Sequence, residues 1–149
     1  MFPQARVFIR TALVYLGCAL VIGGVLLVDQ GLYLSAITSA LHLAFYHLLM
    51  VGWMVQFICG VALWLFPVKS RTKPRGNERL GWAAYAALNS GLLLRILAEP
   101  LHLWQHQTWT AGALVASALL QVGGVWMLIA VLWPRVTARP TKKEQAHTV

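Results

Sequence analysis

Residues 41–66 read LHLAFYHLLMVGWMVQFICGVALWLF and contain no Asp, Glu, Lys or Arg. A helix needs about 20 mostly apolar residues to cross the hydrocarbon core of a bilayer, so this run predicts a membrane span. Three further runs qualify: residues 7–28, 80–98 and 111–133. The composition agrees, with 59% hydrophobic residues, 11% charged residues and a mean hydropathy of +0.68. We therefore expect an all-α integral membrane four-helix bundle over residues 1–136, followed by a polar tail over residues 137–149.

The basic residues indicate how the helices are oriented. They precede the first span (Arg6, Arg10), lie between the second and third spans (residues 69–79) or follow the fourth (from Arg135 on), and only Arg95 departs from this pattern. The positive-inside rule then places both termini in the cytoplasm, which fits the cytoplasmic membrane of a bacterium or archaeon. Orientation and contact with anionic lipid explain the net charge of +8, so we expect no nucleic-acid partner. The first span is longer than the apolar region of a signal peptide and is expected to be a permanent helix.

Three amides fall near the middle of the predicted spans when depth is counted at about 1.5 Å per residue. Gln56, Asn89 and Gln121 belong to the second, third and fourth spans respectively. Amides at this depth are expected to form hydrogen bonds between helices, which stabilise the bundle. A path for protons or quinol is the functional alternative.

Histidines gather at the predicted outer end of the bundle. His42, His47, His102 and His106 all fall there, together with Glu99, while Arg95 occupies the outer third of its span. A charge inside the membrane costs at least ~2.5 kcal/mol on insertion scales, so Arg95 needs a partner, and Glu99 is the nearest candidate. If the third helix continues past Pro100, then Arg95, Glu99, His102 and His106 share one face. The structural alternative is a local ion pair beside histidines that are ordinary interfacial residues.

Two kinds of metal site fit these residue types. Imidazoles on facing helices can ligate the iron of haem b, with Arg95 neutralising a propionate and Trp53 offering a ring on which the cofactor stacks. Copper is the alternative, because His47, Met50 and Met54 share a face and His102 or His106 can complete the set. His42 and His47 lie about 140° apart around a helix, so both cannot face one iron.

The run from His47 through Gly52, Trp53 and Gly60 to Pro67 resembles the second helix of the catalytic subunit of haem-copper oxidases and nitric oxide reductases. In that family a histidine near the outer start of this helix ligates the low-spin haem. The resemblance implies that His47 is an axial haem ligand. It also implies that this chain is similar to one of the three four-helix units of that subunit, and that it assembles as a homo-oligomer, a dimer or a trimer.

The same resemblance limits the activity that is expected. Nothing within the membrane after His106 supplies the copper-binding histidines of that family, so we expect redox activity rather than a complete oxidase. The second axial ligand is left open among His102, His106, His42 and a second copy of His47. The expected function is electron transfer or binding of O2 or NO, with quinol or an external electron carrier as partner. A cofactor-free accessory subunit of an oxidase is a further alternative, whereas no nucleotide loop or nucleophile triad supports hydrolase or kinase chemistry.

Overall fold

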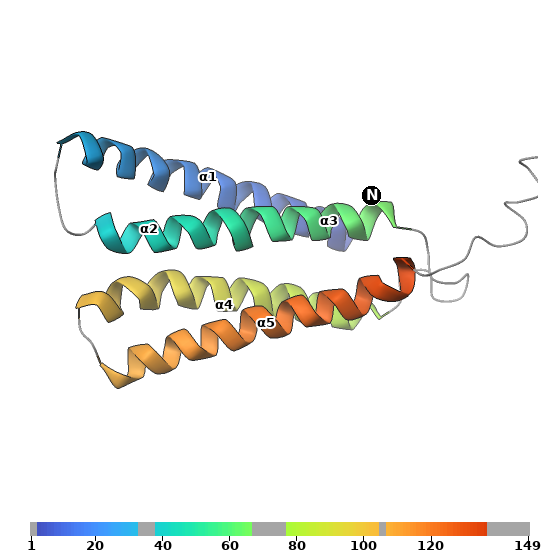
Figure 1. The fold of residues 1–149 in the computed structure, drawn as a ribbon. Helices are drawn as coiled ribbons and strands as arrows, with labels where there is room; N and C mark the ends of the chain where they lie inside the picture. The colour runs from blue at the N-terminus through green and yellow to red at the C-terminus, as the bar shows by residue number, and fades with distance from the viewer. Residues whose placement is uncertain (1–2, 33–37, 67–76, 105–106, 137–149) are drawn as a thin grey trace, which may run out of the picture.

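The computed structural model of the protein describes residues 3–32, 38–66, 77–104 and 107–136 (Figure 1). Helix α1 spans Pro3–Leu32, α4 spans Glu78–Trp104 and α5 spans Thr108–Val136. Between α1 and α4, helix α2 (Thr38–His47), the π-helix η1 (Leu48–Val55) and α3 (Gln56–Leu65) follow one another without a gap. The described chain therefore holds four helices that are long and apolar enough to cross a membrane, which confirms the predicted all-α fold. The predicted tail and His106 lie outside the described residues.

The helices are longer than their predicted apolar runs, and two of them continue through a proline. The third helix continues beyond residue 98 through Pro100 to Trp104, and the fourth continues through Pro134 to Val136. Proline removes one hydrogen bond but does not have to end a helix in a membrane, because neighbouring helices can satisfy the released carbonyl. The expected stop before Pro67 is confirmed, since Phe66 is extended, with φ −68° and ψ 142°.

The helices form two antiparallel hairpins that pack side by side (Figure 1). One hairpin pairs α1 with the continuous helix α2–η1–α3, and the other pairs α4 with α5. We call the end that contains the start of α1 and the end of α5 the terminal end. The opposite end, where α2 begins and α4 ends, is called the histidine end because His42, His47 and His102 lie in its helices.

The apolar core is concentrated towards the terminal end. Its buried members come from all four long helices: Ala5, Phe8, Leu63, Ala84, Leu88, Leu128 and Val131. Gly124 permits the close packing of α5 on α4, because a Cβ atom there would lie 3.1 Å from the backbone nitrogen of Leu88 and 3.2 Å from the carbonyl oxygen of Ala84. This end of the bundle is therefore held mainly by interlocking apolar side chains.

Large apolar side chains also cover the outside of the bundle. Val21 on α1, Trp126 on α5 and Leu97 on α4 each expose about two thirds of their surface, at 69%, 66% and 66%. Such extensive apolar exposure is unusual for a protein in water but matches a hydrocarbon environment. The outer faces of these helices therefore fit a lipid bilayer.

Arg135 closes the terminal end with a contact that charge counting did not predict. Its side chain is only 4% exposed, and its Nη2 donates hydrogen bonds to the carbonyl oxygens of Leu63, at 3.1 Å, and Phe66, at 2.6 Å. The last carbonyls of a helix have no partner inside the helix. Arg135 on α5 therefore caps α3 and joins the two hairpins.

We expect Arg135→Gln to lower the free energy of unfolding by about 1–3 kcal/mol, because the shorter side chain leaves carbonyls of α3 without their donor. Thermal unfolding in detergent measures the effect. Arg10→Gln is the matched control, since Arg10 is exposed on α1 at the same end. Equal stability of the two variants would contradict the capping role.

Candidate functional site at the histidine end

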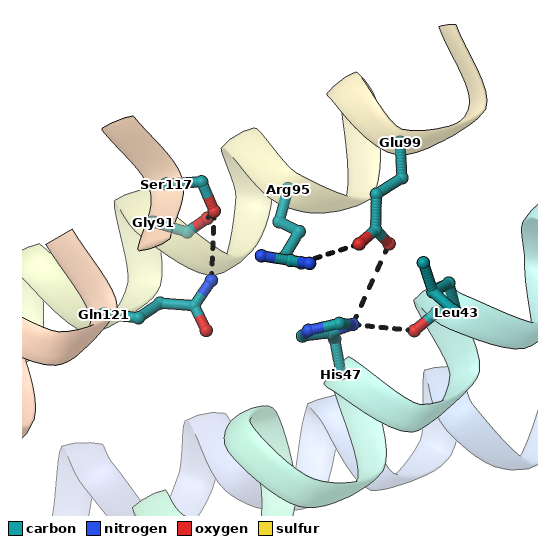
Figure 2. Close-up of polar contacts among 7 residues, drawn as sticks. All are labelled: Leu43, His47, Gly91, Arg95, Glu99, Ser117 and Gln121. Carbon is teal, nitrogen blue, oxygen red and sulfur yellow. Dashed lines mark hydrogen bonds and ion pairs between the residues drawn. The ribbon is translucent and has the colours of Figure 1, made fainter. Parts of the chain in front are cut away.

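His47 is the last residue of α2, and its ring lies between that helix and α4 (Figure 2). The side chain is 24% exposed, and Nδ1 lies 2.8 Å from the carbonyl oxygen of Leu43 one turn earlier. A carbonyl oxygen only accepts hydrogen bonds, so Nδ1 carries the proton in this contact. In the neutral ring, Nε2 then holds the lone pair and is the atom able to bind a metal ion or accept a proton.

Glu99 faces His47 from α4. One carboxylate oxygen, Oε1, accepts a hydrogen bond of 2.6 Å from Nε of Arg95, and the other, Oε2, lies 3.8 Å from Nδ1 of His47. Glu99 is only 4% exposed, whereas Arg95 is 24% exposed. The predicted pairing of Arg95 with Glu99 is therefore confirmed, and His47 joins it as a third member. Figure 2 shows this chain of contacts running across the two helices.

The π-helix that follows His47 was not predicted from the sequence. Segments of this kind are rare and are frequent at functional sites. Gly52 lies within η1, where a Cβ atom would come within 2.9 Å of Tyr15 on α1 and 3.0 Å of Leu92 on α4. The glycine thus lets the helix that carries His47 approach both neighbours, and a glycine inside an apolar run was the only available signal of this close contact.

The other histidines do not join His47 in one described cluster. Nδ1 of His102 lies 2.7 Å from Oγ1 of Thr110, whose hydroxyl donates to the carbonyl oxygen of Gln107. Because that hydroxyl proton is already used, Nδ1 of His102 is the donor, and the contact links the end of α4 to the start of α5. His42 is half-buried on α2, and His106 lies outside the described residues. Within the described ranges, no group of three or more His, Cys, Asp or Glu residues forms a metal cluster.

The remaining predicted ligands lie farther along η1. Met50 and Met54 expose 46% and 39% of their surface and so lie on the outside of the bundle. Trp53 is half-buried on the same π-helix. His47, by contrast, faces α4, so the structure provides no described contact that draws the two methionines into its site.

An apolar cavity of about 290 Å³ lies between η1 and α5 and opens to the outside of the bundle, where its lining residues Val122 and Trp126 expose 56% and 66% of their surface. Val51 and Val55 line it from η1, four and eight residues after His47 and therefore on the same side of the helix. Gln121 lines it from α5, together with Val122, Val125 and Trp126. In Figure 2 the carboxamide of Gln121, the guanidinium of Arg95 and the ring of His47 point toward one another. The cavity therefore begins about one helical turn from His47 and opens to the outside of the bundle.

Two of the three amides near the middle of the helices, Gln56 and Asn89, form the expected hydrogen bonds between helices. Gln56 on α3 and Asn89 on α4 exchange hydrogen bonds of 3.2 and 3.3 Å, and the hydroxyl of Tyr15 on α1 donates to Oδ1 of Asn89 at 2.9 Å. Gln121 differs, because it donates to Ser117 in its own helix at 3.0 Å. Ser117 in turn donates to the carbonyl oxygen of Gly91 at 2.7 Å and so links α5 to α4.

An apolar layer separates these amides from the site at His47. Leu92 lies between Asn89 and Glu99 on α4 and is fully buried, and Leu48 next to His47 is 4% exposed. The contacts of Gln56 and Asn89 join helices and do not continue as hydrogen bonds to Glu99 within the described chain. Their geometry therefore favours the structural interpretation over a transport path.

We expect Asn89→Leu to destabilise the bundle by about 1–3 kcal/mol, because it leaves the fully buried amide of Gln56 without its partner. The double variant Asn89→Leu/Gln56→Leu should recover part of this loss, since removing both members of a pair avoids an unsatisfied group. Unfolding in detergent measures the double-mutant cycle. Additive losses would show that the two amides do not interact.

The site is thus built from His47, Glu99 and Arg95, with Gln121 and the adjacent apolar cavity beside them. Its partners come from α2, η1, α4 and α5, so both hairpins contribute. Comparisons with protein-family models, with curated proteins and with solved structures found no match for this chain.

Proposed function

We propose that this protein binds b-type haem in the membrane, with His47 as an axial ligand, and acts in electron transfer or in binding O2 or NO. The observation that carries the proposal is the hydrogen bond from Nδ1 of His47 to the carbonyl oxygen of Leu43. Histidines that ligate metals almost always donate their other ring N–H to a carbonyl or carboxylate, which fixes the tautomer and the ring orientation. His47 has this arrangement, with Nε2 left to ligate iron.

Arg95 suits the anionic propionates of haem, and the apolar cavity suits its macrocycle. The ion pair with Glu99 uses Nε of Arg95, so the terminal nitrogens of the guanidinium keep their donor capacity for a propionate. Val51 and Val55, about one and two turns after His47 on the same helix, and Trp126 on α5 would offer an apolar surface for the macrocycle. Trp53 is a further candidate for cofactor contact.

The second axial ligand comes from His102, His106, His42 or a second copy of His47. The described residues bring one imidazole to Glu99 and Arg95, while His102 is engaged with Thr110. This arrangement fits a homo-oligomer, a dimer or a trimer, in which another copy completes the ligand set. The proposed site faces the outside of a bacterial or archaeal cytoplasmic membrane, where quinol or an external electron carrier exchanges electrons with it.

When bound, haem b supplies one-electron chemistry or a position for a diatomic gas at its iron. His47 would hold the iron, and Arg95 would compensate the charge of a propionate. No further histidine set for copper follows in the membrane-spanning sequence, so the proposed activity is that of a redox or gas-binding protein rather than of a complete oxidase. Copper binding through His47, Met50 and Met54 and a cofactor-free accessory role are the competing outcomes of the tests below.

The first test is a reduced-minus-oxidised visible spectrum of the purified chain, with metal analysis of the same sample. Sharp b-type bands with haem close to one per chain are expected. Copper without haem would select the copper site, and a folded protein that lacks both metals would favour an accessory subunit.

We expect His47→Ala to abolish haem retention, because it removes the imidazole that, among the described residues, contacts Glu99 and has its tautomer fixed by the Leu43 carbonyl. The helical content, measured by circular dichroism, should stay unchanged. His147→Ala, in the tail, is the matched control and should keep the wild-type spectrum. Full haem retention in His47→Ala would overturn the assignment of the ligand.

A further inference from the structure

We propose that Glu99 is a positioning residue whose charge, held behind the ring of His47, lowers the reduction potential of the haem. The inference rests on the proposed function, because it assigns a role toward the ligand His47. It concerns the reduction potential of bound haem, whereas the proposed function concerns whether haem binds at all. The observation behind it is the buried contact between the second carboxylate oxygen of Glu99 and the imidazole.

The geometry of Glu99 is not that of a simple ion pair. Arginine and carboxylate commonly meet through two parallel hydrogen bonds. Here Nε of Arg95 contacts Oε1 at 2.6 Å, while Oε2 is buried and has no hydrogen-bond partner among the described residues. Leaving a buried carboxylate oxygen unsatisfied is costly. Nδ1 of His47 lies 3.8 Å from this oxygen.

This arrangement gives His47 two acceptors on one side of its ring. The carbonyl oxygen of Leu43 accepts the hydrogen bond at 2.8 Å, and the carboxylate of Glu99 adds a negative charge one ångström farther away. Both favour a proton on Nδ1 and electron density on Nε2. A carboxylate behind a ligating histidine raises the basicity of the ligand in this way.

The effect on a haem follows from charge. Oxidation of the iron adds one positive charge, which a nearby carboxylate stabilises, so Glu99 should lower the reduction potential. Arg95 carries the opposite charge and offsets part of this effect. Loss of the Glu99 charge should therefore raise the reduction potential, and loss of the Arg95 charge should lower it. General loosening of the site would not produce opposite shifts.

The experiment is a spectroscopic redox titration of the purified, haem-loaded chain and three variants. Glu99→Gln should raise the midpoint potential by about 59 mV, the one-electron equivalent of a tenfold change in the equilibrium constant. Arg95→Gln should lower it, and Glu99→Asp, which keeps the charge, should remain closer to wild type than Glu99→Gln. Glu78→Gln is the matched control, because it removes the same charge from the same helix about 30 Å away.

The outcomes distinguish this inference from the proposed function. If the wild-type chain holds no haem, both fail. If haem is bound but the potentials of Glu99→Gln and Arg95→Gln are unchanged or move in the same direction, only the role of Glu99 is overturned. Should Glu99→Gln lose its haem while Glu78→Gln keeps it, the inference is overturned as well, because Glu99 would then be needed for binding rather than for the potential.

Discussion

Hydrocarbon offers no hydrogen bonds, so every polar side chain between these helices has to find its partner inside the protein. The contacts obey this constraint at three depths. At the terminal end, Arg135 donates hydrogen bonds to two carbonyl oxygens. Gln56 and Asn89 form hydrogen bonds in the middle, and Arg95 forms an ion pair with Glu99 at the histidine end. Each contact joins different elements or stiffens one of them. These polar contacts therefore also help to hold the bundle together.

The two ends use different forces and are suited to different tasks. Near the terminal end, buried apolar side chains such as Phe8 and Leu128 interlock, and Gly124 lets α5 approach α4 closely. Near the histidine end, a carboxylate, a guanidinium and an imidazole lie beside an apolar cavity. Close packing gives a rigid support. A ligand-binding site needs such a rigid support, and it also needs polar groups and open space that close packing would fill.

The sequence predicts what depends on composition and misses what depends on neighbours. Hydropathy locates all four spans, and depth counting correctly places Gln56 near Asn89 and Arg95 near Glu99. Passage of α4 through Pro100 was left open by the sequence, because proline often ends a helix in water but can be tolerated inside one in a membrane. The π-helix after His47 has no periodic signature, and the burial of Arg135 depends on where α3 ends rather than on any residue near it in the chain.

The geometry of the ion pair between Arg95 and Glu99 indicates that Glu99 does more than neutralise the charge of Arg95. If its only task were to make Arg95 tolerable in the membrane, a two-bond contact would satisfy both oxygens and use more of the guanidinium. The observed contact instead uses one oxygen, directs the other at His47 and leaves the terminal nitrogens of Arg95 turned toward Gln121 (Figure 2). A buried carboxylate oxygen therefore lies behind the imidazole of His47, while the ion pair leaves the terminal donors of Arg95 unused. The proposed haem site rests on these two features.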